Sequence, residues 1–235
     1  MNLRRAAGGR PLVIGHRGAA AVAPENTLAS LEAAVAARVD LVEFDVSPGL
    51  RLAHSAGEAP DEGISLDDAL EFLTAHGVGA HVDVKLPGYE NSVLEAIDRH
   101  GLRERALVST AYAATSRRFA AIAPGLPVAI GYPRDRLGVS SLRWPVPVKS
   151  AGAIALRQAM PARVPLLLRW ARANTLSLHH ALCSRAAVAT AHRFGAPVFA
   201  WTVNDAADVR RVAAAGVDGI VSDDPESALA TLLAL

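Results

Sequence analysis

Short apolar runs alternate with amphipathic stretches along the whole chain, and this alternation restricts the fold more than any other feature of the sequence. The apolar runs have the length of buried strands, and the stretches between them carry the period of helices. We expect strands over residues 12–16, 41–46, 80–85, 106–109, 127–131, 174–179, 197–203 and 218–222, and helices over stretches such as 28–37, 66–76, 90–100 and 184–195. Eight such units in 235 residues predict a single-domain α/β fold over residues 1–235, a (β/α)8 or TIM barrel.

A doubly wound open sheet is the alternative arrangement of such units, but the chain has no glycine-rich dinucleotide fingerprint. No linker or shift in composition marks a second domain. Residues 1–10 are expected to form a flexible N-terminus. The segment 132–150 is rich in Pro, Arg and Ser, and we expect a long loop there, with Trp144 at the rim or in the core. Helical segments are expected near 151–172.

The composition of the chain indicates which kinds of partner it can bind and in which cellular compartment it is expected. Apolar residues make up 51% of the chain, enough for a substantial core, and 24 basic against 23 acidic residues leave no basic patch for a nucleic acid. Cys183 is the single cysteine, which excludes an intrachain disulfide, and we expect it to be inert core. The basic residues 1–10 lack the apolar part of a signal peptide, and no run reaches membrane-spanning length. We therefore expect a soluble, cytoplasmic monomer or dimer.

Acidic side chains share one face of two neighbouring expected strands. Because side chains of a strand alternate between its faces, Glu43 and Asp45 project together from the strand over 41–46. Asp83 has the corresponding position in the next strand. Active sites of TIM barrels lie at the carboxyl ends of the strands, where these residues fall. Three carboxylates offer oxygen ligands that suit one hard divalent cation, Mg²⁺ or Ca²⁺.

Histidines and cationic side chains reach the same rim. His16 and Arg17 leave the first strand at a glycine-flanked exit, and His54 ends an extended run, 50–54, that we expect to return beside the second strand. Two imidazoles can hold a base and an acid near neutral pH. Arg17 offers a fork of donors, and Lys85 a point charge, to phosphate oxygens. This set of side chains predicts an anionic phosphodiester substrate.

At these residues the chain resembles the glycerophosphodiester phosphodiesterase family, a set of metal-dependent barrel enzymes. The resemblance covers nearly the whole sequence, and its motifs are specific in their joint order and spacing. They are His16-Arg17-Gly18, Pro24-Glu25-Asn26-Thr27, Glu43-Phe44-Asp45-Val46, His54, Asp83-Val84-Lys85, Trp201-Thr202-Val203-Asn204 and Gly216-Val217-Asp218-Gly219-Ile220-Val221-Ser222-Asp223.

The resemblance implies a role for each matching residue. The roles are an acid–base pair for His16 and His54, divalent-cation ligands for Glu43, Asp45 and Asp83, and phosphate contacts for Arg17 and Lys85, with Glu25 at the rim near metal or phosphate. In the family, a substrate hydroxyl beside the phosphoester is thought to attack phosphorus, and water then opens the resulting cyclic phosphate. We therefore expect a small-molecule or lysolipid phosphodiester as substrate, with hydrolysis of glycerophosphodiesters to glycerol 3-phosphate and an alcohol.

Departures from the family pattern leave two alternatives open. Asp83 stands where the family usually has Glu, as in the related sphingomyelinase D-like enzymes, and Ser55 replaces the customary Asp after the second histidine. We expect Ser65 and Asp68 to form the capping box of the next helix. Only residues 55–64 separate it from His54, which is too short for the glycerol-binding insertion of the family. One alternative is a lysophospholipase D-like or sphingomyelinase D-like enzyme that acts on lipid phosphodiesters. The other is a non-catalytic phosphate-binding barrel.

Some polar residues have a structural explanation that competes with a functional one. His81 faces the same way as Asp83 but one step deeper, where a core histidine is as plausible as a supporting residue, so we leave it out of the predicted site. Glu25 could favour the start of a helix with Asn26 as cap, although the resemblance favours a position at the rim. Three histidines on helical stretches are expected to be structural: His76, His100 and His192.

Residues near the carboxyl end are harder to assign. The alternation around Trp201 does not decide its face, and we include it as a pocket residue. At most one of His179 and His180 can face inward. Asp223 and Asp224 precede Pro225 and are expected to cap the final helix rather than bind metal.

Overall fold

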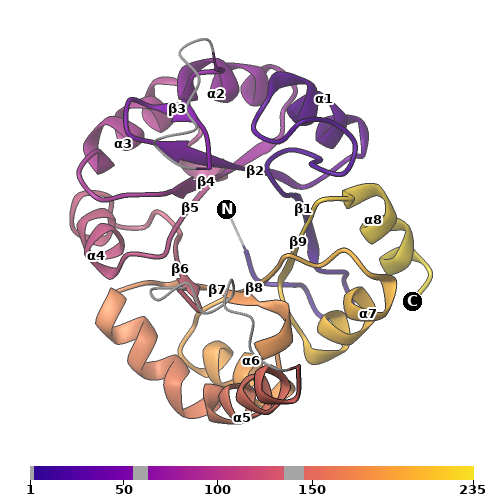
Figure 1. Ribbon diagram of the computed structural model, residues 1–235. Helices are drawn as coiled ribbons and strands as arrows, with labels where there is room; N and C mark the ends of the chain where they lie inside the picture. Colours follow the sequence, from indigo (N-terminus) through magenta and orange to yellow (C-terminus); the bar gives the residue numbers. More distant parts are fainter. Residues whose placement is uncertain (1–2, 55–62, 135–145) are drawn as a thin grey trace.

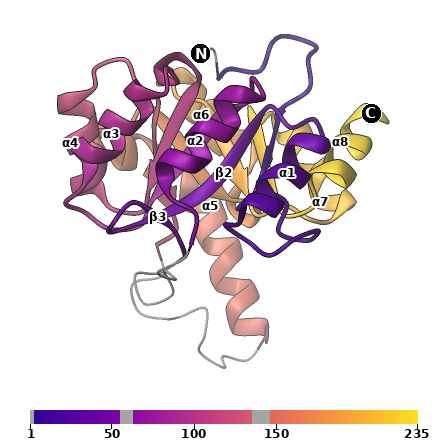
Figure 2. The same ribbon diagram turned by 90° about the horizontal axis from the view of Figure 1, so that it is seen from above.

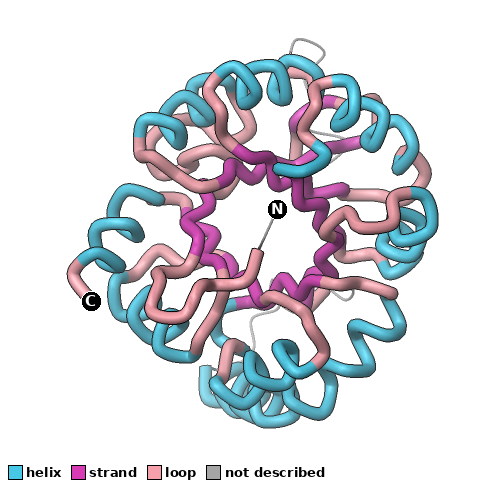
Figure 3. Tube along the Cα trace, turned by 180° about the vertical axis from the view of Figure 1, so that it is seen from behind, coloured by secondary structure: helices cyan, strands magenta, loops and turns pink. Residues whose placement is uncertain are grey.

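Eight parallel strands form a closed barrel, as the sequence predicts (Figures 1 and 3). The computed structural model describes residues 3–54, 63–134 and 146–235. The barrel strands are β1 (Leu12–Gly15), β2 (Leu41–Ser47), β4 (Gly79–Val84), β5 (Ala106–Thr110), β6 (Val128–Tyr132), β7 (Thr175–His179), β8 (Val198–Trp201) and β9 (Gly219–Ser222). The sheet closes because β1 pairs with both β2 and β9.

Helices surround the barrel and follow its strands, so each strand feeds a helix that packs back on the sheet (Figure 1). They are α1 (Leu28–Ala36), α2 (Leu66–Ala75), α3 (Glu90–Arg99), α4 (Ala113–Ile122), α5 (Val146–Ala171), α6 (Arg185–Arg193), α7 (Ala206–Ala215) and α8 (Pro225–Leu233), with the 3-10 turns η1 (Arg103–Arg105) and η2 (His180–Leu182). Within the described residues, no helix is both long and apolar enough to cross a membrane.

A short additional strand, β3 (Arg51–Leu52), lies antiparallel to the end of β2. Val46 is paired with Leu52, so the chain turns back at the carboxyl end of β2 as the alternating run predicts. The predicted capping box of Ser65 and Asp68 then starts α2. This return carries His54 to the rim of the barrel.

The segment after β6 differs from the expectation. The loop predicted over 132–150 is shorter, because α5 begins at Val146 and continues as one helix to Ala171. Pro161 and Pro165 lie inside this helix, although proline usually interrupts a helical pattern. One end of α5 projects past the barrel (Figure 2). Trp144 lies outside the described residues.

Two layers of apolar side chains make the core. The larger one lies between the sheet and the surrounding helices, and the smaller one fills the barrel with Ile14, Leu41, Leu107 and Phe199. Leu3, in the segment expected to be flexible, is only 4% exposed and belongs to this inner cluster. The beginning of the described chain accordingly lies inside the barrel ring (Figure 1). The amino end of the barrel is thus filled, and the carboxyl end holds the polar residues.

Candidate active site

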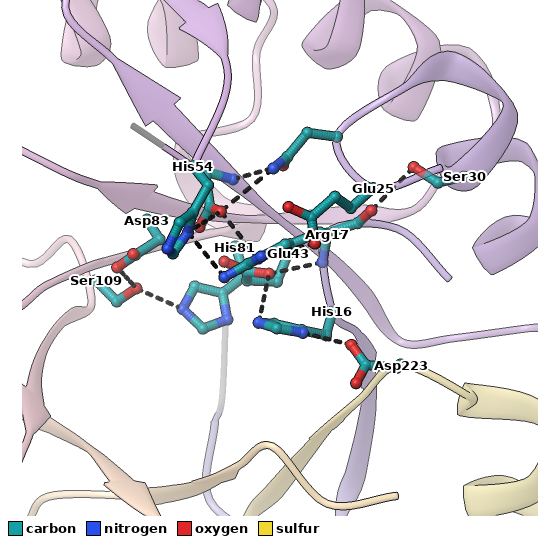
Figure 4. Close-up of polar contacts among 12 residues, drawn as sticks. His16, Arg17, Glu25, Ser30, Glu43, His54, His81, Asp83, Ser109 and Asp223 are labelled. Carbon is teal, nitrogen blue, oxygen red and sulfur yellow. Dashed lines mark hydrogen bonds and ion pairs between the residues drawn. The ribbon is translucent and has the colours of Figure 1, made fainter. Parts of the chain in front are cut away.

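A cavity of about 230 Å³ opens among the carboxyl ends of the strands. Eight of the nine residues predicted for the site line it: His16, Arg17, Glu43, Asp45, His54, Asp83, Lys85 and Trp201. The ninth, Glu25, touches this group through Arg17, whose Nη1 donates a hydrogen bond of 2.6 Å to Glu25 Oε2. Segments far apart in the sequence therefore meet in one constellation (Figure 4).

The three predicted carboxylates converge within the cavity. Glu43 and Asp45 alternate along β2, and Asp83 is the register partner of Asp45 on β4. One oxygen from each carboxylate lies within 4.8 Å of the other two. The side chains of Glu43 and Asp45 are buried at 6% and 1% exposure, so little water screens their mutual repulsion.

Two cationic side chains offset part of this negative charge. Lys85 Nζ lies 2.5 Å from Asp45 Oδ1 and 2.6 Å from Asp83 Oδ2, and Arg17 Nε lies 2.9 Å from Asp45 Oδ2. Although burial opposes the charged form of Lys85, the carboxylates of Asp83, Asp45 and Glu43 raise its pKa above the ordinary value. Lys85 therefore stays an ammonium group.

Glu43 and Asp45 respond to this environment in opposite directions. Burial raises the pKa of the Glu43 carboxyl, and the neighbouring charge of Asp45 raises it further. Burial also opposes ionisation of Asp45, but His54, Lys85 and Arg17 hold the pKa of Asp45 well below its usual range. The negative charge of Glu43 is thus poorly compensated, and an oxygen-only set with this charge fits a divalent cation such as Mg²⁺ or Ca²⁺.

His16 is held by an acidic residue that the sequence analysis assigned elsewhere. Its Nδ1 lies 2.6 Å from Oδ1 of Asp223, and its Nε2 lies 4.0 Å from Glu43 Oε2. Burial disfavours the imidazolium, but the hydrogen bond with Asp223 and the charge of Glu43 outweigh it and raise the pKa of His16. The expectation that Asp223 caps the last helix is wrong, because Asp224 alone is the N-cap of α8 and accepts from Ser227 N.

His54 reaches the cavity from β3 with a half-exposed side chain. Its Nδ1 lies 2.8 Å from Arg17 Nη2 and 3.2 Å from Asp45 Oδ2. This nitrogen can accept from the guanidinium of Arg17 or donate to the carboxylate of Asp45, and the ring tautomer decides between the two. His54 and His16 thus approach the carboxylates from different strands, with separate partners (Figure 4).

The loop after β1 is shaped by unusual backbone conformations. Arg17 has a φ of +49° and donates its backbone N–H to Glu43 Oε2 at 2.8 Å. Gly18 follows with a φ of +86°, and a Cβ there would come within 2.4 Å of the Ser30 backbone, so the close approach of loop and helix requires glycine. The strained turn thus directs both the guanidinium and the N–H of Arg17 into the site.

Asn26 is a residue of the site whose role the sequence analysis missed. Thr27, not Asn26, is the N-cap of α1. Asn26 Nδ2 instead donates to Asp45 Oδ2 at 3.2 Å, and Asn26 Oδ1 accepts from Asp45 N at 3.0 Å. The φ of Asn26 is +58°, a left-handed conformation that asparagine tolerates better than most residues. The Asn in the Pro-Glu-Asn-Thr motif was the available signal.

His81 lies in the wall of the cavity, although the sequence does not predict it as a site residue. It is 2% exposed, lines the cavity, and has its Nε2 2.9 Å from Ser109 Oγ. Ser109 in turn donates to Asp83 Oδ1 at 2.6 Å. Burial lowers the pKa of His81 to about 4, so the ring is neutral near pH 7.

The remaining histidines have structural partners, as expected for those on helices. His100 Nε2 lies 2.9 Å from Asp67, His192 Nε2 lies 2.7 Å from Asp218, and the ring of His76 packs on Phe72. The two histidines at the end of β7, His179 and His180, contact different partners. His179 packs edge-on against Trp201 with ring centroids 5.4 Å apart, and His180 Nδ1 lies 3.1 Å from Asp208 Oδ2.

A wider groove of about 870 Å³ adjoins the cavity, and His54 and Glu25 form its boundary with the site. Its apolar lining comes from Leu28, Leu52, Ile64 and Phe72. Asp68 and Glu71 add carboxylates farther along α2.

The fold and the site are those of a barrel with an active-site cavity at the carboxyl ends of its strands, lined by carboxylates, imidazoles and cationic side chains. The Glycerophosphoryl diester phosphodiesterase family matches residues 16–47 and 53–227 of the chain. The chain therefore belongs to this family, and membership classes it as a phosphodiesterase enzyme.

Individual proteins are similar to this chain over nearly its whole length. A glycerophosphodiester phosphodiesterase of Caldanaerobacter subterraneus is 24% identical over 93% of this chain and 96% of its own. The crystal structure of a glycerophosphodiester phosphodiesterase from Parabacteroides distasonis matches with a TM-score of 0.73 and 17% identity, over 96% of this chain and 98% of that one. A phosphodiesterase of Oleispira antarctica, solved with the product sn-glycerol-3-phosphate, matches with a TM-score of 0.72 and 21% identity, over 94% and 96% of the two chains.

Proposed function

We propose that this protein hydrolyses glycerophosphodiesters to glycerol 3-phosphate and an alcohol. The observation that carries the proposal is the convergence of three carboxylate oxygens within 4.8 Å of one another, beside two imidazoles and two cations in one small cavity. Family membership supports the reaction class, and the Oleispira antarctica relative holds sn-glycerol-3-phosphate, the product expected here.

Glu43, Asp45 and Asp83 are the proposed ligands of one Mg²⁺ or Ca²⁺ ion. The raised pKa of Glu43 supports this, since burial and neighbouring negative charge leave that carboxylate in need of a cation. When bound, the ion would polarise a phosphoryl oxygen and offset the negative charge that develops at phosphorus. Asn26 would hold Asp45 in its orientation through its two hydrogen bonds.

His16 and His54 are the proposed acid–base pair. One imidazole accepts the proton of the substrate hydroxyl beside the phosphoester, and that oxygen forms a bond to phosphorus. The bond from phosphorus to the leaving alcohol breaks, and the other imidazole protonates the departing oxygen. Water then opens the cyclic phosphate with the proton transfers reversed, which yields glycerol 3-phosphate.

The other predicted residues would bind and orient the substrate. Arg17 and Lys85 supply positive charge for the phosphate oxygens, and Arg17 is itself fixed by Glu25. Trp201 lines the cavity and can pack against the substrate's carbon atoms. A cytoplasmic location and a monomeric or dimeric state remain predictions, tested by cell fractionation and by light scattering of the purified protein.

A lysophospholipase D-like activity is a second candidate, because the apolar groove beside His54 could receive a hydrocarbon chain. Phosphorus NMR of the reaction separates the candidates. A cyclic phosphate that persists, formed from a lysophospholipid, would favour the second candidate, whereas glycerol 3-phosphate from glycerophosphocholine favours the first.

The deciding experiment measures release of glycerol 3-phosphate from glycerophosphocholine and glycerophosphoethanolamine with Mg²⁺, Ca²⁺ or EDTA. We expect turnover only with a divalent cation, and its loss in the variants Asp83→Ala, His16→Ala and His54→Ala. Asp98→Ala and His76→Ala, on the protein surface, are the matched controls and should keep wild-type turnover. Undiminished turnover in EDTA or in Asp83→Ala would refute the proposed metal site.

A folded wild-type protein that binds glycerol 3-phosphate but turns over no phosphodiester with any cation would favour a non-catalytic phosphate-binding barrel. Folding of each variant is checked by circular dichroism and thermal unfolding, so that a lost activity is not mistaken for a lost structure.

A further inference from the structure

A chain of hydrogen bonds runs from Asp83 through Ser109 to His81 at the inner end of the cavity (Figure 4). Ser109 Oγ lies 2.6 Å from Asp83 Oδ1 and 2.9 Å from His81 Nε2. All three groups line the same cavity. The chain of contacts therefore extends the polar site inward, past the carboxylates.

The direction of each hydrogen bond follows from the chemistry of the groups. An ionised carboxylate can only accept, so the single hydroxyl proton of Ser109 is given to Asp83. Ser109 Oγ must then accept from His81, which places the ring proton on Nε2. With the ring proton on Nε2, the buried Nδ1 is the nitrogen left to act as an acceptor.

This acceptor has no partner within the part of the chain that the structure describes. His81 Nδ1 is buried and makes no hydrogen bond there, although buried polar atoms are normally satisfied. In Figure 4 the ring presents this nitrogen on the side away from Ser109, toward His16. A fixed, unsatisfied acceptor in the wall of a binding cavity is suited to a ligand that brings a donor.

We propose that His81 Nδ1 accepts a hydrogen bond from the terminal hydroxyl of the substrate's glycerol moiety, and that His81 thereby selects deacylated glycerophosphodiesters. This inference rests on the proposed function and names the substrate class more narrowly. His81 is a specificity-determining residue in this role, and Ser109 is a positioning residue that fixes its tautomer.

The depth of His81 in the barrel decides which hydroxyl it meets. His81 pairs with Glu43 and Asp83 pairs with Asp45 in the strand register, so His81 lies two residues deeper along β4 than Asp83. Two residues of a strand span about 6.6 Å. The hydroxyl beside the phosphoester must stay at phosphorus to react, so the terminal hydroxyl is the one that can extend inward.

The size of the cavity argues against an acyl group at this position. Its volume of about 230 Å³ lies below the ~300–1,000 Å³ typical of sites for drug-sized ligands. A 1-acyl lysophospholipid has an ester in place of the terminal hydroxyl, so it has no donor for His81 Nδ1. It would also have to direct its chain away from the inner end of the cavity.

The test compares substrates that differ at this hydroxyl alone. Glycerophosphocholine has it, and 2-hydroxypropyl phosphocholine of matched configuration lacks it while keeping the hydroxyl beside the phosphoester. We expect wild-type kcat/KM to be about 10- to 100-fold higher for glycerophosphocholine, since the analogue leaves a buried acceptor unpaired. Lysophosphatidylcholine should be as poor a substrate as the analogue or poorer.

Variants then locate the source of the preference. His81→Phe keeps the ring shape without an acceptor and should reduce the ratio to within about threefold. His81→Gln, whose amide oxygen can accept, should retain part of the ratio. Ser109→Ala frees the tautomer and should lower the ratio, whereas Ser177→Ala, in the cavity wall on β7, should keep it.

The outcomes separate this inference from the proposed function. Equal kcat/KM for the two substrates in the wild-type protein would overturn the role of His81 and leave the phosphodiesterase function intact, and would indicate that water satisfies Nδ1. A wild-type preference that persists in His81→Phe would also overturn it, as would an equal loss in Ser109→Ala and Ser177→Ala.

Binding by calorimetry does not depend on turnover or on the folding of a variant. Wild-type protein should bind glycerol 3-phosphate about tenfold more tightly than 2-hydroxypropyl phosphate. Equal affinities for the two compounds, or no binding of either, would overturn the inference about His81, whether or not the protein hydrolyses a phosphodiester. Absence of hydrolysis would be a separate result, and it would refute the proposed function.

Discussion

Asp223 and His16 are joined by a contact of 2.6 Å between Oδ1 and Nδ1, although 207 residues separate them in the chain. The contact forms because β9 pairs with β1 and closes the barrel, which brings the residue after one strand beside the residue after the other. Asn204 donates to Asp223 Oδ2 at 2.6 Å and fixes the carboxylate in turn. The orientation and charge state of His16 therefore depend on barrel closure.

We expect Asp223→Asn to lower turnover of glycerophosphocholine at pH 7 by about 100-fold. The pKa of His16 is raised against the effect of burial by its hydrogen bond with Asp223 and by Glu43, so removal of the Asp223 charge should lower that pKa. A histidine NMR titration of both proteins measures the shift. Asp224→Asn is the matched control, because Asn serves equally well as the N-cap of α8. Equal turnover in the two variants would contradict the role of Asp223.

Removal of the Asn26 side chain should weaken binding of the divalent cation by about 10- to 100-fold. Asn26 is bonded to both the carboxylate and the backbone N–H of Asp45, and without it the carboxylate is free to turn. The measurement is calorimetric titration with Mg²⁺ or Ca²⁺.

Two substitutions of Asn26 separate orientation from backbone strain. Asn26→Gly tolerates the φ of +58°, whereas Asn26→Ala should additionally lower the free energy of unfolding by about 1 kcal/mol. Wild-type cation affinity in Asn26→Gly would show that Asp45 needs no such support.

Cys183 should resist thiol reagents in the folded protein. It is fully buried, and burial raises the pKa of its thiol to about 12, so the reactive thiolate is scarce at pH 8. Labelling with a chromogenic disulfide should proceed only after denaturation. Ala230→Cys places a second thiol on the exposed face of α8 as a positive control and should react at once. Rapid labelling of native wild-type protein would mean that the region around Cys183 opens readily.

Asp208 should contribute stability that is lost in acid. Burial opposes its ionisation, but the hydrogen bond from Arg211 and the neighbouring His180 lower the pKa of Asp208 overall. A lowered pKa in the folded state means that the stabilisation is complete above about pH 4, the range of unfolded aspartate, and disappears as the pH falls through the folded value.

The corresponding variant, Asp208→Asn, should lower the free energy of unfolding by about 1 kcal/mol at pH 7, and the difference from wild type should shrink on acidification. Urea unfolding at several pH values measures it. Asp205→Asn, also at the start of α7, is the control. A difference independent of pH would exclude ionisation of Asp208 as its cause.

Local sequence patterns were enough to predict the barrel and eight of the residues that line its cavity. The period of two along β2 placed Glu43 and Asp45 on one face, and the apolar runs located the barrel strands to within a few residues. These features are local, because side-chain alternation and the boundaries of strands and helices depend on neighbouring residues. The return of the chain that carries His54 was predictable for the same reason.

Contacts made across the barrel became visible only in the folded chain. Asp223 beside His16, Asn26 beside Asp45 and Ser109 between His81 and Asp83 join residues on different strands and loops, and no periodicity within one segment encodes such a pairing. Strand order and register fix which side chains meet, and burial then determines their charge states, because the desolvation of a group depends on everything packed around it. The sequence supplied the groups, and closure of the sheet determined their partners.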